Sequence, residues 1–368
     1  MLRRLFTRMG LVLAALILTV SPAAAQTAPK IHRIVAVGDL HGDYAAWRDI
    51  ARAAGLIDAK GHWIGGDTVF VQTGDVVDRG PDSLKIINDL MRLQKEATRS
   101  GGRVFALVGN HEAMNVTDDL RYVSQGDYAA FVDRNSEQVR ERVYQANKST
   151  LEAAYRKRDP TLTSEAIKQA WIAATPLGML EHQMAWHGDG KIGRWIIANP
   201  AVVLLDGTLF VHGGLSLAYS ATPLDEINRR VAAALKAGDT DPASIINDPM
   251  GPLWYRGLII RDKPAAPAAE GAPAEGPPAA PAAPPAPAPP TIEEELGQVL
   301  KAYGASRIVV GHTPILSGIA VLFDGRLIRI DTGISAYYGG ALTYLEILDG
   351  VAIPHTVQRS VPVKTGAQ

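Results

Sequence analysis

Side chains that can bind a metal ion recur in this sequence at one kind of position. Each follows a short apolar run that ends in glycine. Four segments share this arrangement: Gly38-Asp39-Leu40-His41-Gly42, Gly74-Asp75-Val76-Val77-Asp78-Arg79-Gly80, Gly109-Asn110-His111-Glu112 and Gly311-His312-Thr313. A fifth segment, Val211-His212-Gly213-Gly214, places its histidine directly after the apolar run. Carboxylate, imidazole and amide groups together suit Mn, Fe or Zn.

The spacing of these segments predicts that they meet in space. Asp75 lies 36 positions after Asp39, and Asn110 lies 35 positions after Asp75. Each interval is the length of about one strand–helix–strand unit, which needs roughly 30 residues. Successive parallel strands would deliver these residues to the same sheet edge, where open α/β sheets place their ligand sites. We therefore expect the five segments to converge on one site.

The ligand chemistry is consistent with two ions. One cation can be held by Asp39 and His41, and the other can be surrounded by Asn110, His212 and His312. Asp75 is placed to bridge them. Two metal ions about 3.5–4 Å apart can hold the attacking and leaving oxygens of an in-line displacement.

Short β-branched runs, each bounded by Gly, Asp or Asn, are the strands expected to position these segments. They cover residues 31–37, 68–73, 104–108, 202–205, 208–211 and 307–310. Helix-like stretches at 44–54 and 81–99 separate the first three runs, and this alternation predicts an α/β sandwich. Asp206-Gly207 between two runs predicts a hairpin turn. The mainly helical, polar pattern over 127–184 predicts a helical cap, inserted at 115–192.

The composition excludes several classes of protein and of site. Lys plus Arg total 37 and Asp plus Glu total 38, so the formal net charge is -1. This balance argues against a nucleic acid as partner, because such binders present a basic surface. The chain has no cysteine, which excludes disulfides, thiolate zinc sites, iron–sulfur clusters and cysteine nucleophiles.

The first 25 residues are typical of a secretory signal peptide. Arg3, Arg4 and Arg8 precede an apolar run at 11–20, and small residues end at Ala25. The run is shorter than the roughly 20 residues of a membrane span, so we expect cleavage after Ala25 and no stable membrane anchor. Loss of three arginines leaves 34 basic and 38 acidic residues, a net charge of -4. The expected location is periplasmic or secreted, through the general secretory route or, alternatively, twin-arginine export.

Residues 264–290 contain eleven prolines and twelve alanines among 27 residues. This composition favours extended polyproline II and has no apolar period to bury. It predicts an exposed, disordered spacer that interrupts one domain, which runs from 31 to 368. A binding role for the segment is the alternative.

The five motifs, in this order, resemble those of the phosphoprotein phosphatase family of calcineurin-like metallophosphoesterases. The family forms are GDxHG, GDxVDRG, GNHE, HGG and a late GHT, and the match covers residue 31 to about residue 313. Residues 109–123, 193–195, 226–228 and 251–256 are further similar to the Shewanella-like branch of bacterial protein phosphatases. Leu217 departs from the frequent form HGGLSP. The resemblance implies a calcineurin-like β-sandwich flanked by helices, with an inserted helical cap.

The resemblance also implies roles for individual residues. The first-metal ligands would be Asp39, His41 and Asp75, and the second-metal ligands would be Asp75, Asn110, His212 and His312. His111 matches the general acid, and Asp78 the residue that orients it. Arg79 matches one phosphate clamp, and Arg256 is the candidate for the second. Two divalent ions are implied, Mn in the first place and Fe or Zn as alternatives.

The implied reaction is hydrolysis of a phosphomonoester by direct attack of a metal-bridging hydroxide. Implied substrates are a phosphorylated protein or peptide, with phosphotyrosine among them, or a small phosphomonoester. Two alternatives stay open: a dinucleoside-polyphosphate hydrolase or phosphodiesterase on the same two-metal core, and a non-catalytic binding protein. The intact His111, Asp78 and Arg79 argue against the second. No particular oligomeric state is predicted.

Several residues outside the motifs are interpreted as packing or surface residues. Tyr337 and Tyr338, beside two glycines, are assigned to turn packing. The same interpretation applies to the remaining histidines, which are His32, His62, His182, His187 and His355.

Overall fold

The computed structural model describes residues 30–261 and 289–360. The predicted signal peptide and residues 264–288 of the predicted spacer lie outside this part of the chain. No helix within the described residues combines the length and the apolar character that a membrane crossing requires.

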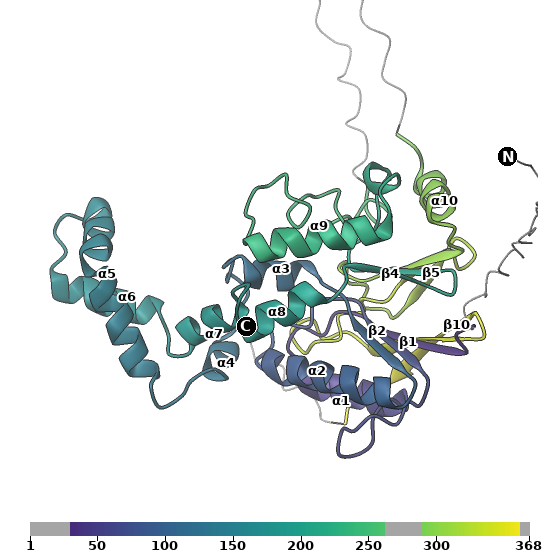
Figure 1. The fold of residues 1–368 in the computed structure, drawn as a ribbon, viewed down its shortest axis with the longest axis horizontal. Helices are drawn as coiled ribbons and strands as arrows, with labels where there is room; N and C mark the ends of the chain where they lie inside the picture. The colour runs from purple at the N-terminus through teal and green to yellow at the C-terminus, as the bar shows by residue number, and fades with distance from the viewer. Residues whose placement is uncertain (1–29, 262–288, 361–368) are drawn as a thin grey trace, which may run out of the picture. The chain divides into compact units, whose positions relative to one another are not determined.

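The described residues contain ten strands, which form two five-stranded sheets (Figure 1). The first has the order β10-β9-β1-β2-β3 and comprises β1 (Arg33–Val37), β2 (Val69–Gln72), β3 (Arg103–Ala106), β9 (Leu342–Leu348) and β10 (Val351–Val357). The second has the order β4-β5-β6-β8-β7 and comprises β4 (Val202–Leu205), β5 (Thr208–Val211), β6 (Arg307–Val310), β7 (Ala320–Leu322) and β8 (Leu327–Arg329). Strands β1, β2 and β3 are parallel, and so are β5, β6 and β8.

Alternate residues of these strands bury two opposite faces, as the period of two along a strand requires. Ile34 of β1 and Val71 of β2 pack in one apolar cluster with Phe210 and Val309 of the other sheet. The residues between them face helices, so that Phe70 packs on the opposite side with Trp47. The predicted sandwich flanked by helices is confirmed.

The helices that cover the first sheet are α1 (Tyr44–Ala53) and α2 (Ser83–Arg99). Helix α1 begins after Asp43, whose carboxylate accepts a hydrogen bond from the backbone N–H of Ala46 at 2.9 Å, a standard N-cap. Helix α2 buries one face at helical spacing, including Ile86, Leu90 and Leu93. On the second sheet, the predicted turn at Asp206-Gly207 has both residues at positive φ, 45° and 75°, as a type I′ hairpin needs.

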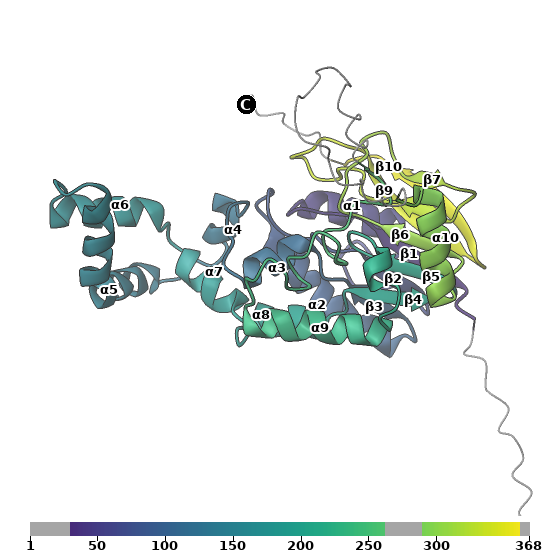
Figure 2. The ribbon, with the colours of Figure 1, turned by 90° about the horizontal axis from the view of Figure 1, so that it is seen from above.

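Six helices lie between β3 and β4: α3 (Asn110–Val116), α4 (Gln125–Ala129), α5 (Ser136–Arg158), α6 (Ser164–Ala174), α7 (Met179–Trp186) and α8 (Lys191–Ala198). Helix α7 packs against α3, α4 and α8. Figures 1 and 2 both show α5 and α6 beyond α7, on the side away from the sheets. The predicted cap limits, 115 and 192, fall inside α3 and α8.

The remaining helices accompany the second sheet. They are the short 3-10 helix η1 (Leu217–Tyr219), α9 (Leu224–Ala237) and α10 (Ile292–Tyr303). Asn228 of α9 accepts hydrogen bonds from the backbone N–H groups of Ala201 and Val202 at 2.8 and 3.0 Å. Helix α9 is thereby tied to the start of β4.

Candidate metal centre

The structure brings all six predicted metal ligands to one end of the two sheets, and all six are buried. Asp39 and His41 follow β1, Asp75 follows β2, and Asn110 opens the helix after β3. His212 follows β5, and His312 lies two residues after β6. Parallel strands of both sheets therefore deliver these side chains from their carboxyl ends, as the spacing of the motifs predicts.

Four electron-pair donors lie close together: His212 Nε2, Asn110 Oδ1, His312 Nδ1 and Asp75 Oδ2. His212 Nε2 lies 2.9 Å from Asn110 Oδ1, 3.1 Å from His312 Nδ1 and 3.3 Å from Asp75 Oδ2. His212 Nδ1 donates to the carbonyl of Thr73 at 2.9 Å, and in the tautomer with this bond the lone pair is at Nε2. Of these four atoms, only His312 Nδ1 can then carry a hydrogen atom. A cation would satisfy the whole set, which fits the predicted second metal site.

A second group shares Asp75 with the first. His41 Nε2 and His111 Nε2 each lie 3.9 Å from Asp75 Oδ2, and His41 Nδ1 donates to the carbonyl of Val77 at 2.9 Å. Both groups have the compactness of a metal site, and Asp75 is their common member. Burial alone would raise the pKa of Asp75, but His212, His111 and His41 hold it well below its usual range. An ionised carboxylate between the two groups suits a bridging ligand.

Asp39 lies beside these groups and outside both of them. Its two carboxylate oxygens accept from the backbone N–H of His312 at 3.2 and 3.1 Å. Burial, together with Asp331 and Asp75, raises the pKa of Asp39. Three buried carboxylates so close together favour a nearby cation, because it would offset their repulsion.

His41 and His312 favour the neutral ring, whereas His111 favours the protonated ring. Burial lowers the pKa of His41 to about 4, and burial with His212 and Arg256 lowers that of His312 to about 2. Both rings are therefore neutral near pH 7, the state that binds metals. For His111, burial acts in the same direction, but Asp75 and Asp78 outweigh it, and its pKa is raised.

His111 and Asp78 form a buried pair at the edge of the centre. His111 Nδ1 lies 2.6 Å from Asp78 Oδ2, and Asp78 Oδ1 accepts from Asn115 Nδ2 at 2.9 Å. Asn115 is four residues after His111 in α3, which places both on one face of the helix. Asn115 lies outside the five motifs, and its spacing from His111 is the sequence signal that indicates it. The pair leaves His111 Nε2 directed towards Asp75 and the pocket.

Glu112 connects the loops that carry Asp75 and Asn110. Its carboxylate accepts from the backbone N–H groups of Gly109 at 2.7 Å, Asp75 at 2.8 Å and Val76 at 2.9 Å. Gly109 approaches so closely that an added Cβ would collide with Asp75 Oδ1. Glycine is required there because the two loops touch through backbone atoms.

Five of the predicted site residues have a left-handed backbone, which non-glycine residues adopt at a cost. The φ angles are 42° for His41, 54° for Asp75, 70° for Asp78, 69° for Arg79 and 66° for His312. Such conformations persist only where surrounding contacts enforce them. Their concentration around one centre indicates that the loops are shaped for the site.

The centre opens into a pocket of about 270 Å³ that is lined by both predicted arginines. The Arg79 guanidinium lies 4.0 Å from the centroid of the Tyr122 ring and donates to Tyr337 Oη at 3.0 Å. Arg256 donates to Thr313 Oγ1 at 3.3 Å. Two guanidinium groups beside a cluster of metal ligands suit an anionic, phosphate-like group.

The pocket also contains residues that sequence reasoning missed. They are Tyr122, Trp254, Pro314, Asp331 and Tyr338. Tyr337, which was assigned to turn packing together with Tyr338, supports Arg79. Tyr122 and Trp254 belong to the segments 109–123 and 251–256 that resemble the Shewanella-like branch, and Pro314 directly follows the last motif. Asp331 and Tyr338 reach the pocket through the packing of a segment that lies outside the five motifs.

A family model described as calcineurin-like phosphoesterase matches residues 32–316, the range over which the five motifs build this centre. The chain belongs to that family. This metallophosphoesterase is 31% identical over 313 residues to Shewanella-like protein phosphatase 2 of Arabidopsis thaliana, a match that covers 83% of this chain and 72% of the relative. It is 27% identical to Shewanella-like protein phosphatase 1 of Plasmodium berghei, over 86% of this chain and 72% of that one.

A solved structure has the same fold as this metallophosphoesterase. It is the cold-active protein-tyrosine phosphatase of a psychrophilic Shewanella species, with a TM-score of 0.61 and 23% identity. The match covers 89% of this chain and 81% of that chain. The 31% identity to Shewanella-like protein phosphatase 2 confirms the resemblance to the Shewanella-like protein phosphatases.

Replacing Asp75 tests the shared position in the metal centre. We expect Asp75→Asn to lose bound Mn²⁺ and phosphatase activity together, because the amide cannot balance the charge of two cations. The matched control is Asp324→Asn. Asp324 has almost the same backbone conformation, φ 55° against 54°, and asparagine tolerates it in both places. Metal analysis of the purified proteins is the measurement, and full metal content in Asp75→Asn would contradict the assignment.

Proposed function

We propose that this metallophosphoesterase hydrolyses phosphate monoesters, with His111 as the general acid. The observation that carries the proposal is the His111–Asp78 pair, at 2.6 Å. It presents His111 Nε2 to a pocket that also contains the ligand cluster and both arginines. Binding alone would not require an imidazole held by a carboxylate beside a phosphate-sized pocket.

The six ligand residues Asp39, His41, Asp75, Asn110, His212 and His312 would hold two divalent ions, with Mn preferred and Fe or Zn as alternatives. When bound, such ions supply Lewis-acid polarisation of phosphoryl oxygens and a nucleophile at neutral pH. The convergence of imidazole, carboxylate and amide groups around Asp75 supports this part of the proposal.

Arg79 and Arg256 bind and orient the phosphoryl group. Arg79 is preorganised, because its guanidinium is stacked on Tyr122 and hydrogen-bonded to Tyr337. A planar guanidinium matches two phosphate oxygens and stabilises the charge that develops on them. Arg256 approaches from the segment after α9, so the two arginines reach the phosphate from different parts of the chain.

His111 transfers the proton that the leaving oxygen needs. Asp78 fixes the ring by accepting the Nδ1–H, so that the proton to be donated is at Nε2. Because the pKa of His111 is raised by Asp75 and Asp78 against the effect of burial, the ring can carry this proton near neutral pH.

A phosphorylated polypeptide is the substrate class that we propose, with phosphotyrosine preferred. Tyr122, Trp254 and Tyr338 line the pocket and offer ring faces to an aromatic leaving group. The names of the related protein phosphatases and of the protein-tyrosine phosphatase with this fold agree with that choice.

His111→Asn tests the general acid. We expect kcat to fall by about 10²–10⁴-fold, the usual contribution of a positioned acid, with Mn²⁺ content retained. The loss should be larger for phenyl phosphate than for p-nitrophenyl phosphate, because a poor leaving group depends more on protonation. His62→Asn, at an exposed histidine, serves as the control. An equal loss for both esters would contradict the role of His111.

A substrate panel tests the reaction itself. Purified protein with Mn²⁺ is assayed against a phosphotyrosine peptide, a phosphoserine peptide, a nucleoside monophosphate and diadenosine tetraphosphate. The expected order places the phosphotyrosine peptide first in kcat/KM. Faster cleavage of diadenosine tetraphosphate would replace the proposal with a dinucleoside-polyphosphate hydrolase.

We also propose that the protein is exported and acts in the periplasm or outside the cell. The support is the basic, apolar and small-residue order of residues 1–25. N-terminal sequencing of the protein from an expressing bacterium should find residue 26 first, in the periplasmic or extracellular fraction. An intact N-terminus in the cytoplasmic fraction would overturn the proposal.

A further inference from the structure

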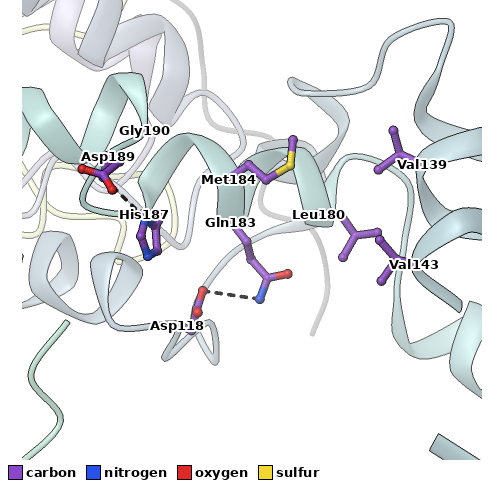
Figure 3. A pocket seen from close by; sticks show the side chains of 9 residues that line it. All are labelled: Asp118, Val139, Val143, Leu180, Gln183, Met184, His187, Asp189 and Gly190. Atoms are coloured by element: carbon purple, nitrogen blue, oxygen red, sulfur yellow. Dashed lines mark hydrogen bonds between the residues drawn. The ribbon is translucent and has the colours of Figure 1, made fainter. Parts of the chain in front are cut away.

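A second cavity lies outside the metal pocket, between α5 and α7 (Figure 3). It is an open groove of about 540 Å³. Its apolar walls are formed by Val139 and Val143 of α5 and by Leu180 and Met184 of α7. Figure 3 shows Leu180 beside Val143, whereas Met184 and Val139 lie apart on the two sides of the gap.

The groove leaves apolar surface without a partner among the described residues. Met184 is 62% exposed, and over its 23 residues α5 buries only Ser136 and Tyr144. Single exposed apolar residues are ordinary, but apolar walls on two facing helices are typical of a binding surface.

The rim of the groove carries negative charge. Asp118 and Asp189 belong to its lining, which contains no Lys or Arg. Gln183 donates to Asp118 Oδ1 at 3.3 Å, which connects the end of α3 to α7. Asp118 has a left-handed backbone, with φ 62°. The groove therefore complements a ligand with an apolar side chain and a nearby cation.

Helix α3 and the segment after it connect the groove to the metal pocket, although no residue lines both cavities. Helix α3 begins with Asn110 and His111, and Asp118 follows its end. Next to Asp118, Asp119 accepts from Arg121 Nε at 2.8 Å, and Arg121 lies 5.7 Å from the ring of Tyr122, which lines the pocket. The seven residues of α3 span about 10 Å, the reach of about three extended residues.

The metal pocket is too small to hold more than one residue of a polypeptide substrate. Its volume of about 270 Å³ is below the roughly 300–1,000 Å³ of sites for drug-sized ligands. It can take a phosphorylated side chain, so the neighbouring residues of the substrate must lie outside it.

We propose that the α5–α7 groove binds the segment of a phosphorylated polypeptide next to its phosphorylated residue. An apolar side chain about three to five extended residues away lies between the two helices, and a Lys or Arg side chain pairs with Asp118. This inference rests on the proposed phosphatase function and adds the substrate features that the groove selects.

Paired phosphopeptides test the groove on the full-length, Mn²⁺-loaded protein. Leu and Lys are placed together three to five residues from the phosphotyrosine, on either side in turn, and each peptide is compared with its Ser-substituted counterpart. We expect the Leu/Lys peptides on one side to have at least about fivefold higher kcat/KM, mainly through KM, as burial of one apolar side chain allows.

Two variants separate the apolar and the charged contacts. Met184→Ser should remove the preference for Leu, and Asp118→Asn should remove the preference for Lys. Asparagine keeps the left-handed backbone of residue 118. The matched controls are Ile64→Ser, at a similarly exposed apolar residue (58%), and Asp324→Asn, and both should keep the preferences of the wild type.

Three results would overturn the inference. If p-nitrophenyl phosphate and phosphopeptides are hydrolysed with no preference on either side, the groove assignment is wrong while the phosphatase function stands. If no phosphomonoester is hydrolysed by the metal-loaded protein, the proposed function fails and the inference fails with it. If light scattering shows that Met184→Ser dissociates an oligomer, the groove binds a second copy of this chain.

Discussion

The carboxylate of Asp75 is the point on which the rest of the site depends. It is buried within 4 Å of three imidazole rings, those of His41, His111 and His212. Asp75 and these rings belong to loops after four different strands, β1, β2, β3 and β5. Glu112 joins the loops after β2 and β3 through their backbone N–H groups. The electron pairs that Asp75, His41 and His212 direct inward need a cation as counterpart. The loops must therefore hold a conformation that also satisfies the metal ions. The left-handed backbone of Asp75 and His312 belongs to this conformation.

Helix α3 connects the metal centre to the groove that we propose binds substrate. Helix α3 begins with Asn110 and His111 at the metal centre, and Asp118, two residues after its end at Val116, lies on the rim of the α5–α7 groove. Its packing against α7 holds the two ends at a fixed separation. The sandwich supplies the catalytic groups, whereas the helices after α3 shape the surface beside them. Variation in those helices can change substrate preference without touching a metal ligand.

Much of the fold followed from local patterns. The strands at 202–205, 208–211 and 307–310 were predicted with their observed limits, because short apolar runs are bounded there by Asp206-Gly207, His212 or Gly311. Convergence of the six ligands followed from their place after parallel strands. His182 was correctly interpreted as a packing residue: it is buried against Tyr128, Phe131 and Trp186.

Other features depend on tertiary contacts that leave no local pattern. Tyr122 and Tyr337 are 215 positions apart in the sequence and meet at Arg79. The left-handed backbone of the site loops is imposed by neighbouring loops, and the turn of Asp39 towards His312 N–H depends on the other sheet. Anomalous diffraction at the manganese edge from Mn²⁺-loaded crystals tests the central claim directly. The account predicts two peaks that share Asp75 as a ligand, with His212 and His312 at one of them. Peaks elsewhere, or an Asp75 carboxylate bound to neither ion, would contradict it.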